Sequence, residues 1–442
     1  MILRPALICA LLAPPLWADG TRVPPGPGAL QQAIAAATPG DVLILTEGIY
    51  SGAVRLDRPL SVTGVAGSVI KGPGAGTVVT IDAPDVTLRG VTVTGSGMDS
   101  EALDAGIKIL KGGDRAVIDA NRVLGNLHGI DIHGGKDARV TGNVIEGTRQ
   151  PRLNDRGNGI YVWNSPGALV QGNSVRWGRD GIFANASRRD VFRDNIFRDL
   201  RFAVHYMYTN DSEVSGNVSI GNHLGFALMF SDRLVVRDNL SLGDRSNGVM
   251  LNYANNADVA GNLVAGGPEK CLFIYNAHKN LIYDNRFEGC AIGIHFTAGS
   301  ERNVLTRNSF IGNREQVKYV GTRHMEWSFE GRGNYWSDHA AFDLNGDGLA
   351  DGAFRPNDLM DHILWSQPAA KLLTGSPAVQ LIRWSQSSFP AVLPGGVVDS
   401  HPLMRPGTIP VPADLAAEAL ALRDRWTKGG GDEFDLDDPK SH

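Results

Sequence analysis

An asparagine recurs at nearly constant spacing along this 442-residue chain, and that repeat restricts the possible folds more than any other feature. Consecutive copies lie 22 or 23 residues apart and end phrases such as VSGN, VRDN or VAGN: Asn173, Asn195, Asn217, Asn239, Asn262, Asn285 and Asn308. Asn121 and Asn143 extend the series. Such a period, with short β-rich runs and Gly/Asn turns, indicates a solenoid. Leucine-rich repeats need recurring leucines that are absent here, so we expect an all-β, single-stranded, right-handed parallel β-helix.

The asparagines are expected to stack as an internal ladder at a turn. Asn tolerates left-handed backbone geometry, and its amide can bond to the copies above and below. Their role is therefore structural. The one longer interval, thirty residues between Asn143 and Asn173, contains the polar segment TRQPRLNDRGN and predicts a loop inserted into one coil.

Eight runs align without gaps: GIDIH (129–133), GIYVW (159–163), GIFAN (181–185), AVHYM (203–207), GFALM (225–229), GVMLN (248–252), CLFIY (271–275) and GIHFT (293–297). All sixteen residues at their second and fourth positions are apolar or aromatic. Because side chains alternate along a strand, these positions should face the lumen, and the third and fifth should face outward.

The outward positions form a stripe of mostly aromatic, methionine and histidine side chains, where a solvated face would be polar. With coils stacked about 4.8 Å apart, we expect His205, Met207 and Met229 in one patch, and Met250 one coil further on. Imidazole and thioether donors suit Cu(I), so these four residues are candidate copper ligands. Alternatively, the Pro-rich C-terminal segment covers the stripe and the methionines only fill space.

A second candidate metal site is the stretch DLNGDGLAD. It places Asp343, Asn345, Asp347 and Asp351 at loop positions 1, 3, 5 and 9, with the carbonyl of Leu349 expected at position 7. Oxygen ligands in this spacing suit Ca²⁺. Position 12 is not an acid, so the loop is not a complete EF-hand, and an Asx-turn loop without metal is the alternative.

The ends of the chain predict an exported protein. Residues 1–18 are typical of a secretory signal peptide, and no later stretch is apolar enough to span a bilayer. We assign 19–365 to the β-helix domain, with the Asp-rich loop 343–351 near its end, and 366–442 to an irregular segment with a helix at 413–426 and an acidic tail. A short helix at 30–37, before a first strand at 42–45, should cap the solenoid.

Two cysteines, Cys271 and Cys290, would remain after signal cleavage. A pair in an oxidising compartment usually forms a disulfide, and thiolate ligation of a metal is the alternative.

Charge and composition argue against two classes of function. A net charge of −5 without a Lys/Arg cluster gives no support for nucleic-acid binding. Polysaccharide-cleaving β-helices need carboxylates, or a Ca²⁺ site with a basic residue, grouped in a cleft. The outward stripe is almost free of acids and lacks Arg and Lys, so we do not expect an enzyme.

Several longer phrases between about Gly28 and His401 resemble the NosD family: HYMYTN, ALMFSD, NYANN, FIYNAHKN, FEGCAIGIHFTAGSERN and GNYWSDHAAFDLNGDGLAD. The resemblance implies the periplasmic β-helix component of an ABC-type system that matures the copper sites of nitrous oxide reductase. It further implies docking on a membrane permease with a cytoplasmic ATPase, and exchange with a copper chaperone and the apo-reductase. Membrane contact would be made only through the permease.

Three functions are therefore compatible with the sequence. The first is a periplasmic copper-handling protein, with a sulfur species as an open alternative for the cargo. The second is a carbohydrate-binding or polysaccharide-modifying β-helix. The third is a docking platform whose aromatic stripe contacts partner proteins without touching metal.

Overall fold

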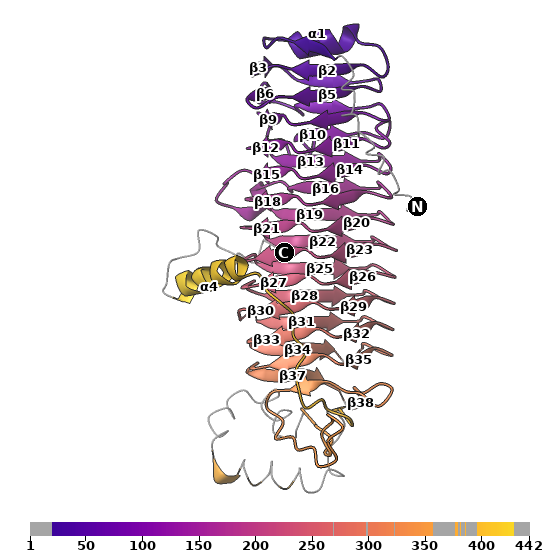
Figure 1. Ribbon diagram of the computed structural model, residues 1–442, viewed down its shortest axis with the longest axis vertical. Coiled ribbons are helices and arrows are strands. Elements are labelled where there is room, and N and C mark those ends of the chain that lie inside the picture. The colour runs from indigo at the N-terminus through magenta and orange to yellow at the C-terminus, as the bar shows by residue number, and fades with distance from the viewer. Residues whose placement is uncertain are drawn as a thin grey trace, which may run out of the picture.

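The computed structural model describes residues 20–267, 269–297, 299–321, 323–356, 376–378, 381, 385 and 396–427. The predicted signal peptide, the acidic tail and most of 357–395 lie outside the described residues. The described chain winds into a long parallel β-solenoid, so the predicted fold class is confirmed (Figure 1). Within the described ranges, no helix has both the length and the apolar character needed to cross a membrane.

Each coil contributes one strand to each of three parallel sheets, named here A, B and C in the order in which a coil meets them. Sheet A contains β1 (Thr21–Val23), β2 (Val42–Leu45), β5 (Ser61–Gly64), β8 (Thr87–Arg89), β11 (Val117–Asp119), β14 (Arg139–Thr141), β17 (Leu169–Gln171), β20 (Val191–Arg193), β23 (Glu213–Ser215), β26 (Val235–Arg237), β29 (Asp258–Ala260), β32 (Leu281–Tyr283) and β35 (Val304–Thr306). Sheet B contains β3 (Gly48–Ser51), β6 (Ser68–Lys71), β9 (Thr92–Thr94), β12 (Arg122–Leu124), β15 (Val144–Glu146), β18 (Ser174–Arg176), β21 (Ile196–Arg198), β24 (Val218–Ile220), β27 (Leu240–Leu242), β30 (Leu263–Ala265), β33 (Arg286–Glu288), β36 (Ser309–Ile311) and β39 (Tyr335–Trp336). Sheet C contains β4 (Val54–Leu56), β7 (Val79–Ile81), β10 (Ala105–Ile109), β13 (His128–His133), β16 (Ile160–Trp163), β19 (Asp180–Asn185), β22 (Phe202–Met207), β25 (Leu224–Met229), β28 (Asn247–Asn252), β31 (Lys270–Tyr275), β34 (Ile292–Thr297) and β37 (Glu315–Val320).

The eight aligned runs form consecutive strands of sheet C, from β13 to β34, and they pair in the register that the alignment predicts. Ile182 pairs with Val204, for example, and Val204 with Phe226. All sixteen residues at the second and fourth positions are at most 1% exposed, so the predicted lumen-facing set is confirmed. Burying each large apolar side chain contributes about 1.5–3 kcal/mol, which fixes the inward face of every coil.

The asparagine ladder is present and runs through the insertion without a break. The Asn195 amide donates to the carbonyl of Val170 (2.9 Å) and to Oδ1 of Asn217 (3.0 Å). Across the thirty-residue interval, the backbone and side-chain N–H groups of Asn143 both donate to Oδ1 of Asn173, each at 2.9 Å. The inserted loop, which includes the 3₁₀ turn η1 (Leu153–Asp155), therefore leaves the register unchanged.

The prediction that the ladder asparagines adopt left-handed backbone geometry was wrong, because that geometry occurs one residue earlier. The ladder asparagines are not in the left-handed region. The residue before each one is: Asp194 has φ 57° and Gly216 has φ 62°. The turn thus places the left-handed bend on the preceding residue, usually Gly or Asp but Ala120 and Arg307 in two coils. The Asn side chain can then point inward and satisfy buried backbone groups.

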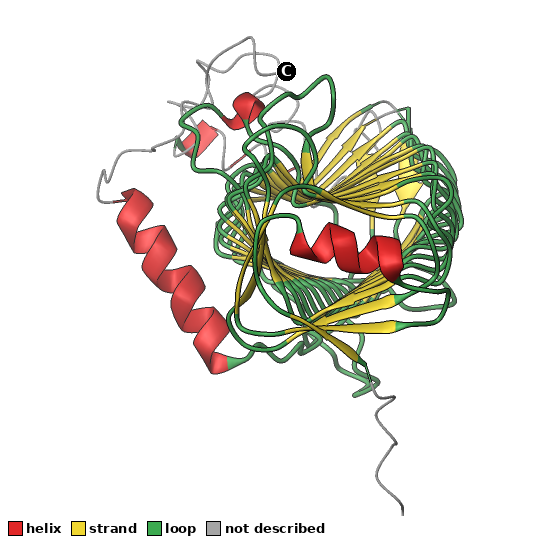
Figure 2. Ribbon diagram, turned by 90° about the horizontal axis from the view of Figure 1, so that it is seen from above, coloured by secondary structure: helices red, strands yellow, loops and turns green. Residues whose placement is uncertain are grey.

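Both ends of the solenoid are closed in the described structure. Helix α1 (Ala29–Ala36) lies over the N-terminal opening with Leu30 and Ile34 buried, as expected of a cap (Figure 2). At the other end, the short pair β38 (His324–Glu326) and β40 (Gly396–Val398) lies beyond β37. There Asp399 accepts hydrogen bonds from the backbone N–H of Asn334 and from Nε1 of Trp336, each at 2.7 Å, and so ends the ladder.

A disulfide joins Cys271, in β31, to Cys290, whose Cα atom is 5.7 Å away. Both residues are buried. Neither sulfur is a thiolate in this state, so the geometry favours the disulfide over thiolate metal ligation.

The C-terminal helix packs on sheet B. Helix α4 (Ala413–Thr427), expected at 413–426, contacts β24 and β27. Leu415 joins a cluster with Val218 and Leu240, and Glu418 pairs with Arg198 (Nη2 to Oε2, 2.8 Å). The alternative that the C-terminal segment covers the Met/His stripe does not hold for α4, which packs on the apolar outer face of sheet B. Most of the Pro-rich part of that segment lies outside the described residues.

We expect Asn195→Ala to lower the free energy of unfolding by about 2–3 kcal/mol, because Asn173 loses its acceptor and the carbonyl of Val170 loses its donor inside the protein. Urea denaturation followed by circular dichroism would measure the change. Asn154→Ala, at an exposed position of the insertion, is the matched control and should change stability by less than about 0.5 kcal/mol. Equal effects would contradict a structural role for the ladder.

Candidate functional site

The four candidate copper ligands lie on one wall, the outer face of sheet C. Met207 and Met229 are direct partners on neighbouring strands. His205 pairs with Ala227, which in turn pairs with Met250. Met207 and Met229 are half-buried, so they are neither in the lumen nor on opposite walls.

Ala227 is a small residue between larger ones on this wall. It has the smallest side chain of the outward third positions, yet it is 0% exposed. Its column neighbours are His205 and Met250, and Met229 follows two residues along the same strand. The longer side chains around this methyl group must therefore close over it. We call Ala227 and its four neighbours His205, Met207, Met229 and Met250 the Ala227 notch.

His205 is oriented by a buried carboxylate. Its Nδ1 lies 3.0 Å from Oδ2 of Asp180. The same carboxylate accepts two hydrogen bonds from Arg201: Nη2 donates to Oδ2 (2.7 Å), and Nε donates to Oδ1 (2.8 Å). A carboxylate only accepts, so Nδ1 carries a proton, and it is Nε2 that remains to act as a metal donor in the neutral form of the ring. Nε2 is buried without a hydrogen-bond partner. Histidine ligands of metals are commonly held this way, with the second ring nitrogen bound to a carboxylate.

The ionisation of Asp180 supports this tautomer. Burial alone would raise the pKa of Asp180, but the hydrogen bond from His205 and the guanidinium of Arg201 outweigh it and hold the pKa well below the usual 3.8. The carboxylate is therefore charged at neutral pH and keeps both partners in place.

Rings extend the wall on both sides of the notch. Phe183 stacks on His205 with ring centroids 4.7 Å apart, and Tyr161 stacks on Phe183 at 5.3 Å. Phe202 meets the His205 ring edge-on at 5.1 Å. These contacts fix the imidazole plane, so His205 is pre-organised while the methionines keep their rotatable bonds.

A second row of rings follows the ends of the same strands. Tyr208, Phe230 and Tyr253 have left-handed φ angles of 54°, 50° and 51°. Their rings stack at 5.3 and 5.2 Å, and Tyr208 and Tyr253 are 54% and 43% exposed. Such backbone strain costs of order 1–3 kcal/mol and is often kept where function needs it. We call these three residues the aromatic ridge.

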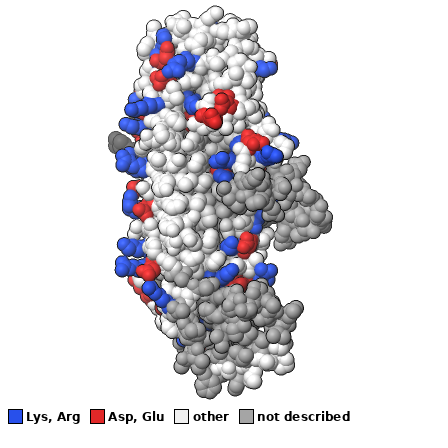
Figure 3. All heavy atoms as spheres, turned by 180° about the vertical axis from the view of Figure 1, so that it is seen from behind, with Lys and Arg blue, Asp and Glu red and all other residues white. Residues whose placement is uncertain are grey.

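The wall carries little charge. From Tyr161 to Thr297 the outward third and fifth positions of sheet C hold no Lys, Arg, Asp or Glu. Figure 3 shows one face of the molecule on which charged side chains lie along the flanks and leave an uncharged band between them. Long-range attraction of ions is therefore weak here, and recognition must depend on short-range contacts.

The carboxylates of the Asp-rich loop accept hydrogen bonds from the backbone of the same loop. Asp343 accepts the backbone N–H groups of Gly346 (2.6 Å) and Gly348 (2.9 Å), and Oδ1 of Asp347 accepts that of Leu349 (2.8 Å). Across the part of the chain that the structure describes, no three His, Cys, Asp or Glu side chains are grouped so as to hold a metal. Calcium at Asp343, Asn345, Asp347, Leu349 and Asp351 stays a prediction without structural support, and the Asx-turn alternative fits the observed bonds.

Sequence reasoning missed Asp180 and Arg201. Because side chains alternate along a strand, counting back from Ile182 predicts that Asp180 faces the lumen. In the structure Gly181 has no partner in the strand pairing of β19 with β22, and the Asp180 carboxylate lies beside His205. A Cβ on Gly181 would collide with Phe197 and with the carbonyl of Ala203. The glycine at the start of six of the eight runs was the available signal that the alternation breaks there.

The chain is similar to a family of binding proteins. The profile described as "Periplasmic copper-binding protein (NosD)" matches residues 141–341. A protein of Stutzerimonas stutzeri named "Probable ABC transporter binding protein NosD" is 41% identical over 82% of this chain and 86% of its own length. A protein of the same name from Pseudomonas aeruginosa is 42% identical over 82% of this chain and 87% of its own.

Solved structures support the fold alone. The N-terminal fragment of gene product 12 of bacteriophage Phi29 superposes with a TM-score of 0.54 at 12% identity, covering 70% of this chain and 68% of that one. At this identity the likeness carries no function.

We expect Asp180→Asn to destabilise the protein by about 3–5 kcal/mol at pH 7, because Arg201 loses its buried partner. The pKa of Asp180 is depressed in the fold, so its contribution is present above about pH 4 and is lost as the pH falls below that value. The stability gap between wild type and variant should therefore narrow between pH 5 and pH 2, as measured by urea denaturation at several pH values. A gap that widens on acidification would contradict the assigned charge state.

Proposed function

Because this chain belongs to the NosD family of periplasmic copper-binding proteins, we propose that it binds Cu(I) at the Ala227 notch and delivers it for assembly of the copper sites of nitrous oxide reductase. One observation carries the location: Nε2 of His205 is buried and without a hydrogen-bond partner, on a wall where two methionines are direct neighbours. A polar atom left unsatisfied in a buried site is costly unless a ligand uses it.

The donor set suits a cargo that must be released. Cu(I) accepts soft thioethers together with one imidazole, and harder ions such as Ca²⁺ or Mg²⁺ prefer oxygen. Met207, Met229 and Met250 are neutral, so binding needs no deprotonation and places one positive charge on the wall. With three rotatable bonds each, the methionines can approach the ion without movement of the backbone. His205 supplies the fixed donor.

The partners follow from the relatives, whose names describe ABC transporter binding proteins. We infer that this chain works in the periplasm beside such a transporter, receives copper from a chaperone and passes it to the apo-reductase. The aromatic ridge, exposed and next to Met207 and Met229, is the surface we assign to transient partner contact. The relatives are named as binding proteins, and we propose no catalytic activity for this chain.

Titration with Cu(I) against a chromogenic competitor tests the site. We expect the double variant Met207→Leu, Met229→Leu to bind at least tenfold more weakly than wild type, because leucine keeps the volume and removes the sulfur. Met98→Leu removes an exposed thioether elsewhere and should leave the affinity unchanged. Unchanged affinity in the double variant would remove the proposed site and favour a docking platform.

Filling the notch tests the same site without removing a donor. We expect Ala227→Leu to weaken Cu(I) binding at least tenfold, because the added methyl groups occupy the space enclosed by His205, Met229 and Met250. Ala186→Leu, at an exposed position two coils away, is the matched control. Thermal unfolding of both variants would separate loss of the site from loss of the fold. A fully folded Ala227→Leu protein with wild-type affinity would place the copper elsewhere.

A further inference from the structure

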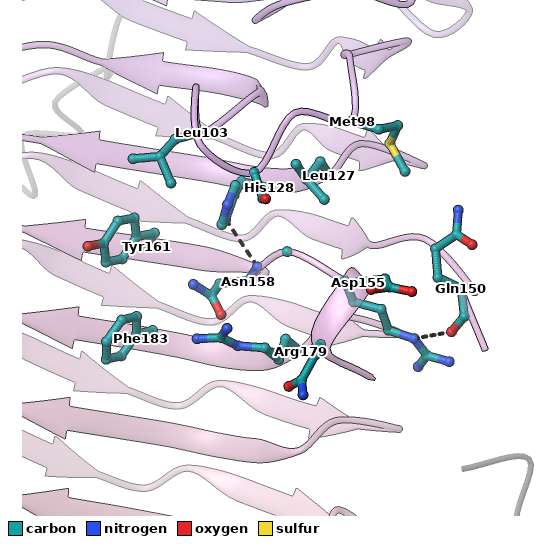
Figure 4. Close-up of a pocket in the computed structure, with 14 residues that line it drawn as sticks. Met98, Leu103, Leu127, His128, Gln150, Asp155, Asn158, Tyr161, Arg179 and Phe183 are labelled. Atoms are coloured by element: carbon teal, nitrogen blue, oxygen red, sulfur yellow. Dashed lines mark hydrogen bonds between the residues drawn. The ribbon is translucent and has the colours of Figure 1, made fainter. Parts of the chain in front are cut away.

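A cleft of about 500 Å³ lies where the inserted loop meets the start of the sheet C strands. The side chains of one edge come from 98–103, those of the other from 150–158, and the floor comes from β13, β16 and β19 (Figure 4). We call it the insertion cleft. Its volume is in the range of sites that bind small molecules.

Arg179 brings an uncompensated positive charge to this cleft. In the described structure no carboxylate lies within ion-pair distance of its guanidinium, and its buried Nε has no hydrogen-bond partner. Burial lowers the pKa of Arg179 from the usual 12.5, which marks a cation that an anion would stabilise. The neighbouring Asp180 is already bonded to Arg201 and His205.

Charges of both signs surround the cleft, including the carboxylates of Asp104 and Asp131 near His128. Arg156 adds a second guanidinium, whose Nε donates to the carbonyl of Gln150 (2.6 Å). Asp131 is paired with Lys108, with Nζ to Oδ2 at 3.3 Å. The carboxylate among the lining residues, Asp155, is exposed at the rim.

Asn158 and His128 add polar groups aligned by the backbone. Nδ1 of His128 accepts the backbone N–H of Asn158 at 3.1 Å, so the neutral ring carries its proton on Nε2. Asn158 is only 4% exposed, and its buried Oδ1 has no hydrogen-bond partner. It is an acceptor that requires a donor such as a hydroxyl group.

Tyr161 and Phe183 form an apolar floor. Their rings are nearly parallel, with centroids 5.3 Å apart and an angle of 6° between the planes. In Figure 4 the side chain of Arg179 points toward Asn158 and Phe183, and all three residues line the cleft. This combination fits a small ring that carries both a carboxylate and hydroxyl groups.

We propose that the insertion cleft binds an acidic sugar: the uronate carboxylate pairs with Arg179, a hydroxyl group donates to Oδ1 of Asn158, and the sugar ring lies against Tyr161 and Phe183. The cleft adjoins the copper site, because Phe183 also stacks on His205. The proposed sugar contacts include none of the proposed copper donors, so loss of one binding activity in these tests leaves the other to be measured separately.

Ligand-observed NMR titration of the full-length protein with D-galacturonate, D-galactose and benzoate tests the proposal. We expect galacturonate to bind at least tenfold more tightly than galactose, which lacks the carboxylate, and than benzoate, which lacks hydroxyl groups. Arg179→Gln should weaken galacturonate binding at least tenfold. Arg188→Gln, which removes an exposed guanidinium at another corner of the solenoid, should not.

A second variant keeps the test valid if Arg179→Gln does not fold. Asp155→Asn removes the exposed rim carboxylate, and should tighten galacturonate binding severalfold at low salt while leaving galactose binding unchanged. Absence of galacturonate binding, equal binding of galactose, or equal binding of benzoate would each overturn the proposal. So would equal losses in Arg179→Gln and Arg188→Gln.

Discussion

The in-register stacking of parallel strands is the interaction on which the rest of the structure depends. Each coil places its apolar side chains over those of the previous coil, and a one-residue slip would turn them outward. The asparagine ladder adds directional bonds to this non-directional packing, because each buried amide has its partner one coil away. With both in place, residues 22 or 23 positions apart become neighbours, and a functional wall is built from residues distant in sequence.

The period of the asparagines was enough to predict the architecture, the lumen-facing residues and the neighbours on the outer wall. These depend on repetition, which a single sequence displays directly. The start of each sheet C strand was not predictable in this way, since the alternation breaks at Gly181 and turns Asp180 toward His205. The insertion was located correctly, but the cleft beneath it depends on side chains of three coils and a loop whose path no periodicity describes.

The position of the C-terminal helix shows a different limit of prediction from sequence. Both the Met/His stripe and the outer face of sheet B are apolar, and composition alone could not decide which one would be covered. The structure places α4 on sheet B, where Leu415 meets a row of aliphatic residues and Glu418 finds Arg198. A hydrophobicity pattern does not predict an ion pair between two residues that lie 220 positions apart.

The continuity of the ladder beneath the inserted loop has an evolutionary consequence. Asn143 bonds to Asn173 as closely as if the intervening residues were an ordinary coil, so the length of the loop does not affect the stacking of the coils. Segments at this corner can therefore lengthen, shorten or change composition through mutation without moving His205 or the methionines. One corner of the solenoid is thus open to change while the geometry of the adjoining wall is held by the stack beneath it.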